Sequence, residues 1–410
     1  MELLLKDHVS RVLQLQSEAG YKDSTLSFYR IAYNRLEVLA EQMDVDRFTE
    51  ELANAFLEDS TSRRTGTFCQ SRSQLQHIAV MRLREYAATG QINWKQNVHH
   101  KPLRKKPNTR TFQRLLEDYL DFLLSEGKKQ NTIDGYRNVA TAFLLFCEKH
   151  KMVELATLTP LTVAGFFKEL TQTWSPLSIR TAASALRSLL IFAQAPNQAI
   201  QAVPQNCLRK TVIPQVLTEE EEVGLWNALG DRETSARDRA LVMLLFVTGL
   251  RPVDAVHLLL EDIDWKKGVI HLVQQKTDRR LTLPLAPAVG NAILEYVTTF
   301  RPASRYRNVF LKSFAPYAPL TGHSACYTIT KRLFQKAGIT RKEPAAGGRL
   351  FRSGAASNLL KAGVPLPHIA ACLGHSDPES TQAYLSIDRQ KMQQCILPLP
   401  PAGKAGEEDA

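Results

Sequence analysis

Two proline-containing stretches divide this chain of 410 residues into three parts. The first stretch, residues 95–109, is basic and contains Pro102 and Pro107, and the second, residues 199–216, contains Pro204 and Pro214. Proline fixes its own backbone and lacks an amide proton, so such stretches interrupt helices and strands. The sequence therefore predicts domains at 1–94, 110–198 and 217–399, with a disordered tail at 400–410.

The first two parts share a sequence pattern. Residues 17–30, SEAGYKDSTLSFYR, resemble residues 125–137, SEGKKQNTIDGYR, with one extra residue in the loop of the first copy. Each segment lies between two helical patterns, and in each a polar pair ending in threonine can cap the following helix. The pattern indicates a helical domain that occurs twice, and convergent patterning of two helical hairpins is the alternative.

The third part predicts helices around one small antiparallel sheet. Thr218 and Glu221 have the spacing of a capping box, which places a helix start directly after the second proline-containing stretch. Residues 268–275 and 281–285 predict two strands, and residues 276–280 between them predict the turn of a β-hairpin. The chain is therefore expected to be mainly α and multidomain, with a mixed α/β domain at its C-terminal end.

Tyr384 follows a series of basic residues that suit chemistry on phosphate. A phenol with a pKa near 10 is a poor nucleophile at neutral pH, and a phosphodiester anion repels it. Such a reaction needs fixed positive charge on the non-bridging oxygens and an acid for the leaving alkoxide. Arginine suits the first role because its planar fork donates two hydrogen bonds and stays charged, whereas lysine can give up a proton.

At these residues the chain resembles the tyrosine recombinases of the phage integrase family. The segment around Arg251, TGLRPVDAVHL, looks like the first-arginine motif, and Arg349 to Arg352, RLFR, occupies the His-x-x-Arg position. The pair Gly374-His375 matches the third motif, and Tyr384 follows nine residues later. The resemblance implies that residues 110–198 form a SAM-like core-binding domain that holds DNA and that residues 217–399 form the catalytic domain. The first part would be an additional helical domain.

The resemblance also implies a role for each residue. Tyr384 would be the nucleophile, giving a 3′-phosphotyrosyl link and a free 5′-hydroxyl group, and Lys276 at the hairpin tip would be the general acid. The non-bridging oxygens would be held by Arg251, Arg352 and His375. Asp254, one helical turn after Arg251, is expected to orient that arginine through a charge-assisted hydrogen bond.

Arg349 departs from the family pattern, which usually has histidine or lysine at this position. An arginine stays protonated in a protein and cannot accept the tyrosyl proton. Arg349 is therefore expected to stabilise charge, and the general base would be water, the phosphate itself or another group.

The charge of the chain supports a nucleic-acid partner. The formal net charge is +11, and cations of this kind neutralise phosphates and release counterions. The candidates for contacts to double-stranded DNA outside the catalytic residues are Lys101, Arg104, Lys105, Lys106, Arg137 and Arg180. A solvated linker is the alternative for the basic run at 101–106.

Several other classes of protein are not indicated. The sequence has no apolar stretch long enough to span a bilayer and no basic region typical of a signal peptide at its start. Its six cysteines lack the spacing of zinc ligands, and it has no phosphate-binding glycine-rich loop. We expect a protein of the bacterial cytoplasm that associates with the nucleoid, has reduced cysteines and needs no cofactor or metal.

The resemblance implies a site-specific recombinase that integrates or excises a mobile element. It would act as a homotetramer on two DNA sites, with partner recombinases or DNA-bending proteins as further partners. One alternative is an enzyme like the type IB topoisomerases. Another is a DNA-binding regulator with a decayed site, which Arg349 favours, as does the helix-turn-helix pattern of residues 357–370 around Gly363.

Overall fold

The computed structural model describes residues 4–61, 66–94, 106–205, 214–320, 322–340, 347–375, 381 and 385. Two compact units divide the chain, one made of residues 1–100 and 212–410 and the other of residues 101–211. Within the first unit, the helices of residues 5–94 and the elements of residues 217–375 have separate hydrophobic cores. The proposed tail at 400–410 lies outside the described residues.

The first group of helices precedes residue 94. It consists of α1 (Leu5–Glu18), α2 (Asp23–Gln42), α3 (Glu50–Glu58) and α4 (Gln70–Thr89). Thr49 accepts the amide proton of Leu52 with its hydroxyl oxygen and so begins α3. The apolar faces of these helices close on fully buried side chains such as Tyr33, Leu36 and Leu52.

The second unit has the same kind of architecture. It consists of α5 (Arg110–Ser125), α6 (Gln130–Lys149), the 3-10 turn η1 (Leu155–Thr157), α7 (Pro160–Thr171), α8 (Pro176–Phe192) and α9 (Asn197–Gln201). The helix α9 occupies the start of the stretch 199–216, where the sequence predicts a linker. It is helical because Ala199 and the nearby Val203 are buried in the core of this unit.

The two helical groups match residue by residue over their first two helices. Gly20 and Gly127, which are 107 positions apart (127 minus 20), both have positive φ, and they follow matching hydrogen bonds from Ala19 to Leu15 and from Glu126 to Phe122. The same offset relates α2 to α6, from 23 and 130 to 42 and 149. It also relates the buried face of α1 to that of α5: Leu5, Val9, Val12 and Gln16 correspond to Phe112, Leu116, Tyr119 and Leu123.

The constant offset corrects one detail of the sequence comparison. That comparison placed an extra residue in the loop of the first copy, because it aligned Ser17 with Ser125. The hydrogen bonds of the two turns pair Ala19 with Glu126 and Gly20 with Gly127 instead, so neither loop has an insertion. The shared Ser-Glu letters are a coincidence one position out of register.

The C-terminal part combines helices with a small sheet. Its elements are α10 (Glu219–Gly230), α11 (Ala236–Thr248), α12 (Pro252–His257), η2 (Leu260–Asp262), β1 (Ile263–Asp264), β2 (Val269–Val273), β3 (Arg280–Pro284), α13 (Pro287–Glu295), the π-helical turn η3 (Tyr296–Phe300), α14 (Gly322–Lys336), α15 (Gly348–Lys361) and α16 (Leu366–Leu373). The predicted capping box is confirmed, because Thr218 and Glu221 exchange hydrogen bonds at the start of α10. The apolar helix α11 forms the centre and contacts α13, α14 and α15.

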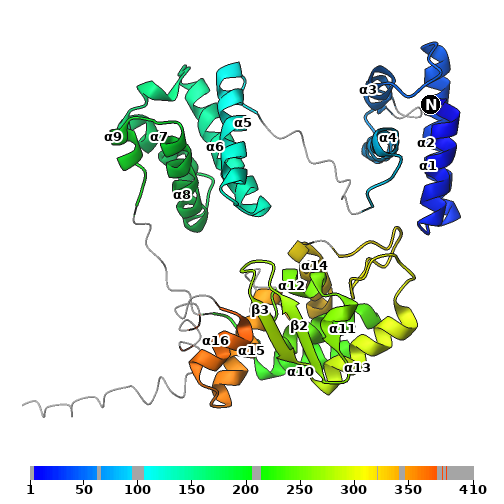
Figure 1. Ribbon diagram of the computed structural model, residues 1–410, viewed down its shortest axis with the longest axis vertical. Helices are drawn as coiled ribbons and strands as arrows, with labels where there is room; N and C mark the ends of the chain where they lie inside the picture. The colour runs from blue at the N-terminus through cyan, green and yellow to red at the C-terminus, as the bar shows by residue number, and fades with distance from the viewer. Residues whose placement is uncertain are drawn as a thin grey trace, which may run out of the picture. The chain divides into compact units, whose positions relative to one another are not determined.

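The predicted hairpin is also confirmed. β2 and β3 pair antiparallel with Val273 opposite Arg280, and β1 adds a third strand on the other side of β2. Their alternating pattern buries Ile270 and Leu272 from β2 against the helices. Figure 1 shows the hairpin beside α15 and α16, and α16 contacts β3. The hairpin tip therefore lies next to the end of α16.

Candidate active site

Arg251 is placed by a sharp turn at the end of α11. Gly249 ends this helix in the left-handed conformation with φ +62°, and Arg251 then begins α12. A Cβ atom on Gly249 would lie 2.9 Å from both Ala355 Cβ and Leu373 Cδ2. Glycine is needed here both for the backbone angle and for the close approach of α15 and α16.

Asp254 lies against Arg251 but does not form the expected hydrogen bond with it. Arg251 Nη1 and Asp254 Oδ2 are 3.9 Å apart, which is an ion pair too long for a hydrogen bond. The other carboxylate oxygen, Oδ1, accepts the amide proton of Gln275 at 2.8 Å. Burial raises the pKa of Asp254, against the opposing effects of the Gln275 hydrogen bond and the nearby arginines.

Arg352 lies on α15 and is buried. Its Nη1 donates to the carbonyl oxygen of Gly249 at 3.0 Å, and its Nη2 donates to the carbonyl oxygen of Leu373 at 2.6 Å. α15 can approach α12 because Gly348 has no side chain, since a Cβ atom there would lie 2.1 Å from Pro252 Cγ. The guanidinium of Arg352 therefore connects the ends of α11 and α16.

The end of α16 brings the two arginines together. The last carbonyl groups of a helix have no partner within the helix and carry partial negative charge. Here the carbonyl of Leu373 accepts from Arg352 and from Gln274 Nε2, and the carbonyl of Gly374 accepts from Arg251 Nη2 at 3.4 Å. Arg251 and Arg352, 101 positions apart (352 minus 251), thus bind adjacent peptide groups.

His375 follows directly after this turn and is half-buried. Its Nδ1 lies 2.7 Å from the hydroxyl oxygen of Thr381, a buried residue that the sequence analysis did not identify. If the threonine hydroxyl donates, the ring proton of neutral His375 is on Nε2, where it can donate to a phosphate oxygen. Thr381 therefore sets the orientation of the imidazole ring.

Lys276 is exposed in the turn between β2 and β3. The turn is attached to the rest of the site at three residues. Gln274 reaches Leu373, the amide group of Gln275 reaches Asp254, and Arg279 Nη1 donates to the carbonyl oxygen of His375 at 3.2 Å. These contacts have no signal in the sequence, because each partner of the turn is far away along the chain.

Arg349 and Tyr384 are the remaining catalytic candidates from the sequence. Arg349 lies in the first turn of α15, three residues before Arg352, and is exposed. Tyr384 lies outside the described residues. The structure thus brings together Arg251, Arg352, His375 and the turn of Lys276.

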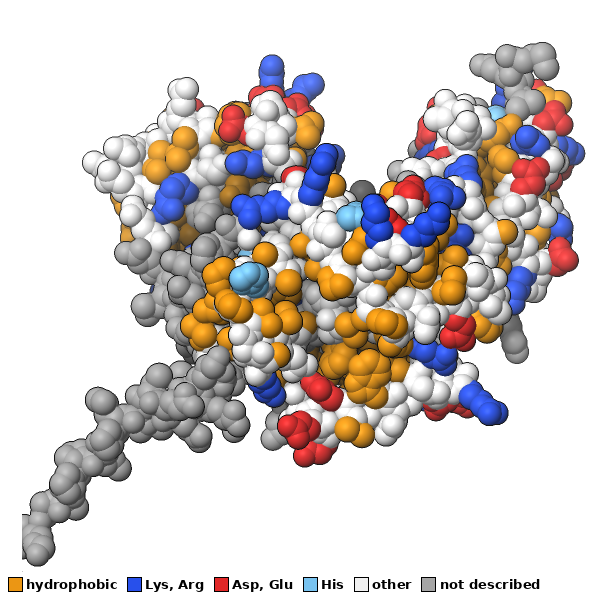
Figure 2. All heavy atoms as spheres, turned by 60° about the horizontal axis from the view of Figure 1, so that its bottom comes forward, with side chains coloured by type: hydrophobic (Ala, Val, Ile, Leu, Met, Phe, Trp, Pro, Cys, Tyr) orange, Lys and Arg blue, Asp and Glu red, His pale blue; other side chains and the backbone are white. Residues whose placement is uncertain are grey.

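The other candidate DNA contacts are distributed over the second unit and the segment before it. Lys101, Arg104 and Lys105 lie outside the described residues, and Lys106 is exposed just before α5. Arg180 is exposed on α8, whereas Arg137 on α6 pairs with Asp134 at 3.3 Å. On the face in Figure 2, basic side chains lie among acidic and apolar ones.

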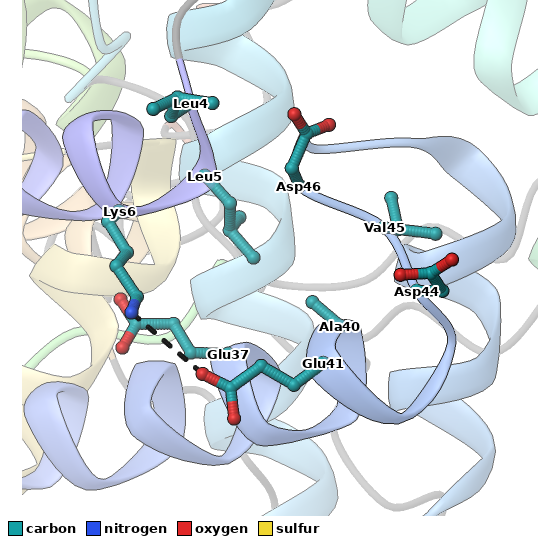
Figure 3. A pocket seen from close by; sticks show the side chains of 9 residues that line it. All are labelled: Leu4, Leu5, Lys6, Glu37, Ala40, Glu41, Asp44, Val45 and Asp46. Carbon is teal, nitrogen blue, oxygen red and sulfur yellow. Dashed lines mark ion pairs between the residues drawn. The ribbon is translucent and has the colours of Figure 1, made fainter.

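A cavity of about 620 Å³ in the first helical group is acidic. Figure 3 shows Glu37, Glu41, Asp44 and Asp46 at this cavity, and Lys6 pairs with Glu41 at 3.8 Å. Carboxylates at this density repel phosphates. This end of the first helical group is therefore unsuited to contact a DNA backbone.

Neither a membrane span nor a metal site is found in the part of the chain that the structure describes. None of the helices described is both long and apolar enough to span a membrane. Among the same residues, no three His, Cys, Asp or Glu side chains cluster as ligands of a metal ion.

Comparison with known sequences gives two family matches. The sequence profile of the Phage integrase family matches residues 215–391, and that of the Phage integrase, N-terminal SAM-like domain, matches residues 116–196. The chain is 31% identical over 310 residues to the "Putative integrase/recombinase y4rA" of Sinorhizobium fredii, covering 74% of this chain and 73% of the relative. It is 27% identical to the tyrosine recombinase XerC of Listeria welshimeri, covering 69% of this chain and 96% of the relative.

Solved structures show the same fold. The post-cleavage complex of the XerH site-specific recombinase with a palindromic difH substrate matches with a TM-score of 0.56 and 18% identity, covering 71% of this chain and 96% of that one. A lambda integrase tetramer bound to a Holliday junction matches with a TM-score of 0.51 and 18% identity, covering 78% of this chain and 92% of that one.

Proposed function

The chain belongs to the phage integrase family and is a tyrosine-type site-specific recombinase, and we propose that it integrates or excises a mobile element through a 3′-phosphotyrosyl intermediate. Breaking and rejoining DNA is the activity of the family.

One observation carries the proposal for the phosphate site. Arg251 and Arg352 lie next to each other at the end of α16, and Arg251 Nη1 is buried with no hydrogen-bond partner among the described residues. A buried charged donor without an acceptor is costly. A non-bridging oxygen of the scissile phosphate, bound by the two guanidinium groups, would supply a compensating negative charge.

The proposed reaction is a transesterification. Tyr384 Oη attacks phosphorus at the 3′ side of the scissile bond, the bond from phosphorus to the 5′ oxygen breaks, and Lys276 transfers a proton to that oxygen. Arg251, Arg352 and His375 bind the non-bridging oxygens as charge builds up on them. The phenolic proton leaves to water, to the phosphate or to another base, because Arg349 cannot accept it.

The bond energy is kept in the phosphotyrosyl link, so the reverse attack by a 5′-hydroxyl group reseals the DNA without a cofactor. Asp254 and Thr381 support the phosphate-binding residues. The first lies against Arg251, and the second fixes the ring of His375.

A suicide duplex tests this proposal. The duplex carries the crossover site and a nick that lets the short 5′-hydroxyl strand diffuse away, so the enzyme remains attached to DNA. The wild-type chain is expected to form an adduct that survives denaturant, and Tyr384→Phe is expected to form none. An adduct with Tyr384→Phe would overturn the nucleophile assignment, and DNA binding without an adduct by the wild-type chain would favour a regulator.

The assembly and the setting are also proposals. Double-stranded DNA is the partner, and a homotetramer on two paired sites would supply one tyrosine for each of the four strands exchanged. The likeness to the lambda integrase tetramer on a Holliday junction supports this arrangement. Partner recombinases and DNA-bending proteins are further candidates, and the site of action would be the nucleoid in a bacterial cytoplasm.

The domain assignment adds a second copy of one fold. Residues 110–198 are the SAM-like core-binding domain, with Arg137 and Arg180 as DNA contacts, and residues 217–399 are the catalytic domain. Residues 1–94 are a second copy of the core-binding fold, which the offset of 107 residues between the helices α1 and α2 and the helices α5 and α6 supports. The acidic cavity is one reason to expect that residues 1–94 contact a smaller area of DNA than residues 110–198 do.

A further inference from the structure

Gln274 has a buried side-chain amide group at the base of the turn that holds Lys276. Its exposed fraction is 0%. Nε2 donates to the carbonyl oxygen of Leu373 at 3.2 Å, and Oε1 accepts the hydroxyl proton of Thr277 at 2.8 Å. The backbone of Gln274 donates to Arg279 and accepts from Asp278, both at 2.9 Å. One residue therefore connects both sides of the turn to α16.

The acceptor that Gln274 uses belongs to the phosphate-binding part of the site. The carbonyl oxygen of Leu373 also accepts from Arg352 at 2.6 Å. The side-chain amide of Gln274 also lies against Gly374, the residue after Leu373. A Cβ atom on Gly374 would lie 2.4 Å from Gln274 Nε2. The turn of Lys276 and the guanidinium of Arg352 are thus held against the same peptide group.

Because Gln274 is buried, the folded turn requires its hydrogen bond to Leu373. A side-chain amide in an apolar environment is unfavourable unless its hydrogen bonds are made, so the folded turn is stable only with Gln274 docked on Leu373. The side chain of Lys276, two residues later, is exposed and long. Its position relative to the arginines depends on the geometry of the backbone that carries it.

We propose that Gln274 is a positioning residue. It holds the turn that carries Lys276, the proposed general acid, at a fixed position relative to Arg352. The inference rests on the proposed role of Lys276 as the acid that protonates the 5′ oxygen. Misplacement of a reacting group by about 1 Å lowers rates by roughly 10²-fold. Loss of the Gln274 contact therefore slows proton transfer and leaves phosphate binding by the arginines in place.

The test compares two leaving groups on the same suicide duplex. An ordinary 5′ oxygen needs a proton to leave, whereas a 5′-bridging phosphorothioate leaves as a thiolate and does not. Gln274→Met keeps the length and apolar volume of the side chain but removes both of its hydrogen bonds. We expect this variant to cleave ordinary DNA about 10- to 100-fold more slowly than wild type and the phosphorothioate at a near wild-type rate.

A second variant gives a pH profile that a packing defect would not produce. Gln274→Glu can donate to Leu373 only while the new carboxyl group is protonated, and its ionised form repels the carbonyl oxygen. Its rate on ordinary DNA, relative to wild type, is expected to fall as the pH rises, with no such fall on the phosphorothioate. Val273→Thr is the matched control, because Val273 is the neighbouring residue but its side chain is half exposed.

The outcomes separate this inference from the function on which it rests. If Lys276→Ala is not rescued by the phosphorothioate, the acid assignment fails and the inference fails with it. If Lys276→Ala is rescued but Gln274→Met is slow on both duplexes, Gln274 acts on the arginines or on folding, and the inference alone is wrong. Wild-type rates of Gln274→Met on ordinary DNA would also overturn it.

Discussion

Arg251 Nη1 and Asp254 Oδ2 face each other at 3.9 Å, and neither buried atom has a hydrogen-bond partner among the described residues. The separation leaves the two charges attracted but incompletely compensated. A phosphate oxygen bound by Arg251 would add a second negative charge beside the arginine and so change its interaction with Asp254. The pair therefore links the stability of the free protein to its proposed binding site.

The first prediction concerns the pH dependence of stability at Asp254. Burial raises its pKa in the folded state above the ordinary value of 3.8. The folded protein then binds the proton more tightly than the unfolded chain, so this contribution to stability is complete below pH 3.8 and is lost as the pH rises through the raised pKa. Asp254→Asn removes the titration. The stability of wild type relative to Asp254→Asn is therefore expected to be greater at pH 4 than at pH 7.

Urea denaturation of both full-length proteins at each pH measures this difference. Comparing the two proteins cancels the contributions of other carboxyl groups. A difference that grows with pH would show that the ionised form of Asp254 is the stabilised one and that its attraction to Arg251 exceeds the cost of burial.

The second prediction concerns Lys276. If this lysine protonates the 5′ oxygen, Lys276→Ala should slow cleavage of ordinary DNA by roughly 10² to 10⁴, the usual contribution of general acid catalysis. A 5′-bridging phosphorothioate should restore the rate. Equal defects on the two substrates, measured with the same suicide duplex, would assign Lys276 to binding instead.

The third prediction concerns Arg349, which is exposed one turn before the buried Arg352. Arg349→His is expected to keep or raise the cleavage rate, because histidine can donate to phosphate and also take up a proton near neutral pH. Arg349→Ala is expected to lower the rate, because alanine cannot donate to the phosphate. An inactive Arg349→His variant that still folds and binds DNA would show that a permanent charge is required.

The fourth prediction concerns Gly374. This residue has φ +62°, and a Cβ atom would lie within 2.4 to 2.6 Å of the Gln274 amide. Gly363, with φ +79° and no atom within 4 Å of the position that a Cβ atom would take, is the matched control for the backbone angle alone. Gly363→Ala should lower the free energy of unfolding by about 1 to 2 kcal/mol, and Gly374→Ala by a further 1 to 3 kcal/mol or so through overpacking.

A double-mutant cycle checks the cause of the difference. Gln274→Ala creates space, so the combined Gly374→Ala and Gln274→Ala protein should lose less stability than the sum of the two single changes. Additive losses would mean that the clash is relieved elsewhere in the structure.

The sequence predicted the elements whose signals are local. The hairpin follows from the alternation around Ile270, and the start of α10 follows from the spacing of Thr218 and Glu221. The two helices around Gly363 are present as α15 and α16, and the first of them is buried along most of its length. The strand β1 has only two residues, too few for a periodic pattern.

The contacts that organise the candidate site were not predictable in the same way. Gln274 is followed by a second glutamine in a polar turn, which is typical of exposed residues, and only its distant partner Leu373 explains its burial. Thr381 has no sequence signal other than its distance of six residues from His375. Side-chain contacts to backbone carbonyls depend on the tertiary fold, which a single sequence does not reveal.

The last prediction concerns the first helical copy. Its core is separate from that of the catalytic elements, and the six proposed catalytic positions lie after residue 217. A fragment of residues 110–410 should therefore fold and cleave a suicide site. Its affinity for DNA should fall, and the slope of log K against log salt should decrease by about one unit for each phosphate that the fragment no longer binds.

The control is Glu41→Gln in the full chain, because the acidic cavity is expected to face away from DNA and the slope should not change. A fragment that binds with the full affinity and slope and still recombines would show that residues 1–94 contribute neither DNA contacts nor assembly. Residues 1–94 would then serve to recruit another protein.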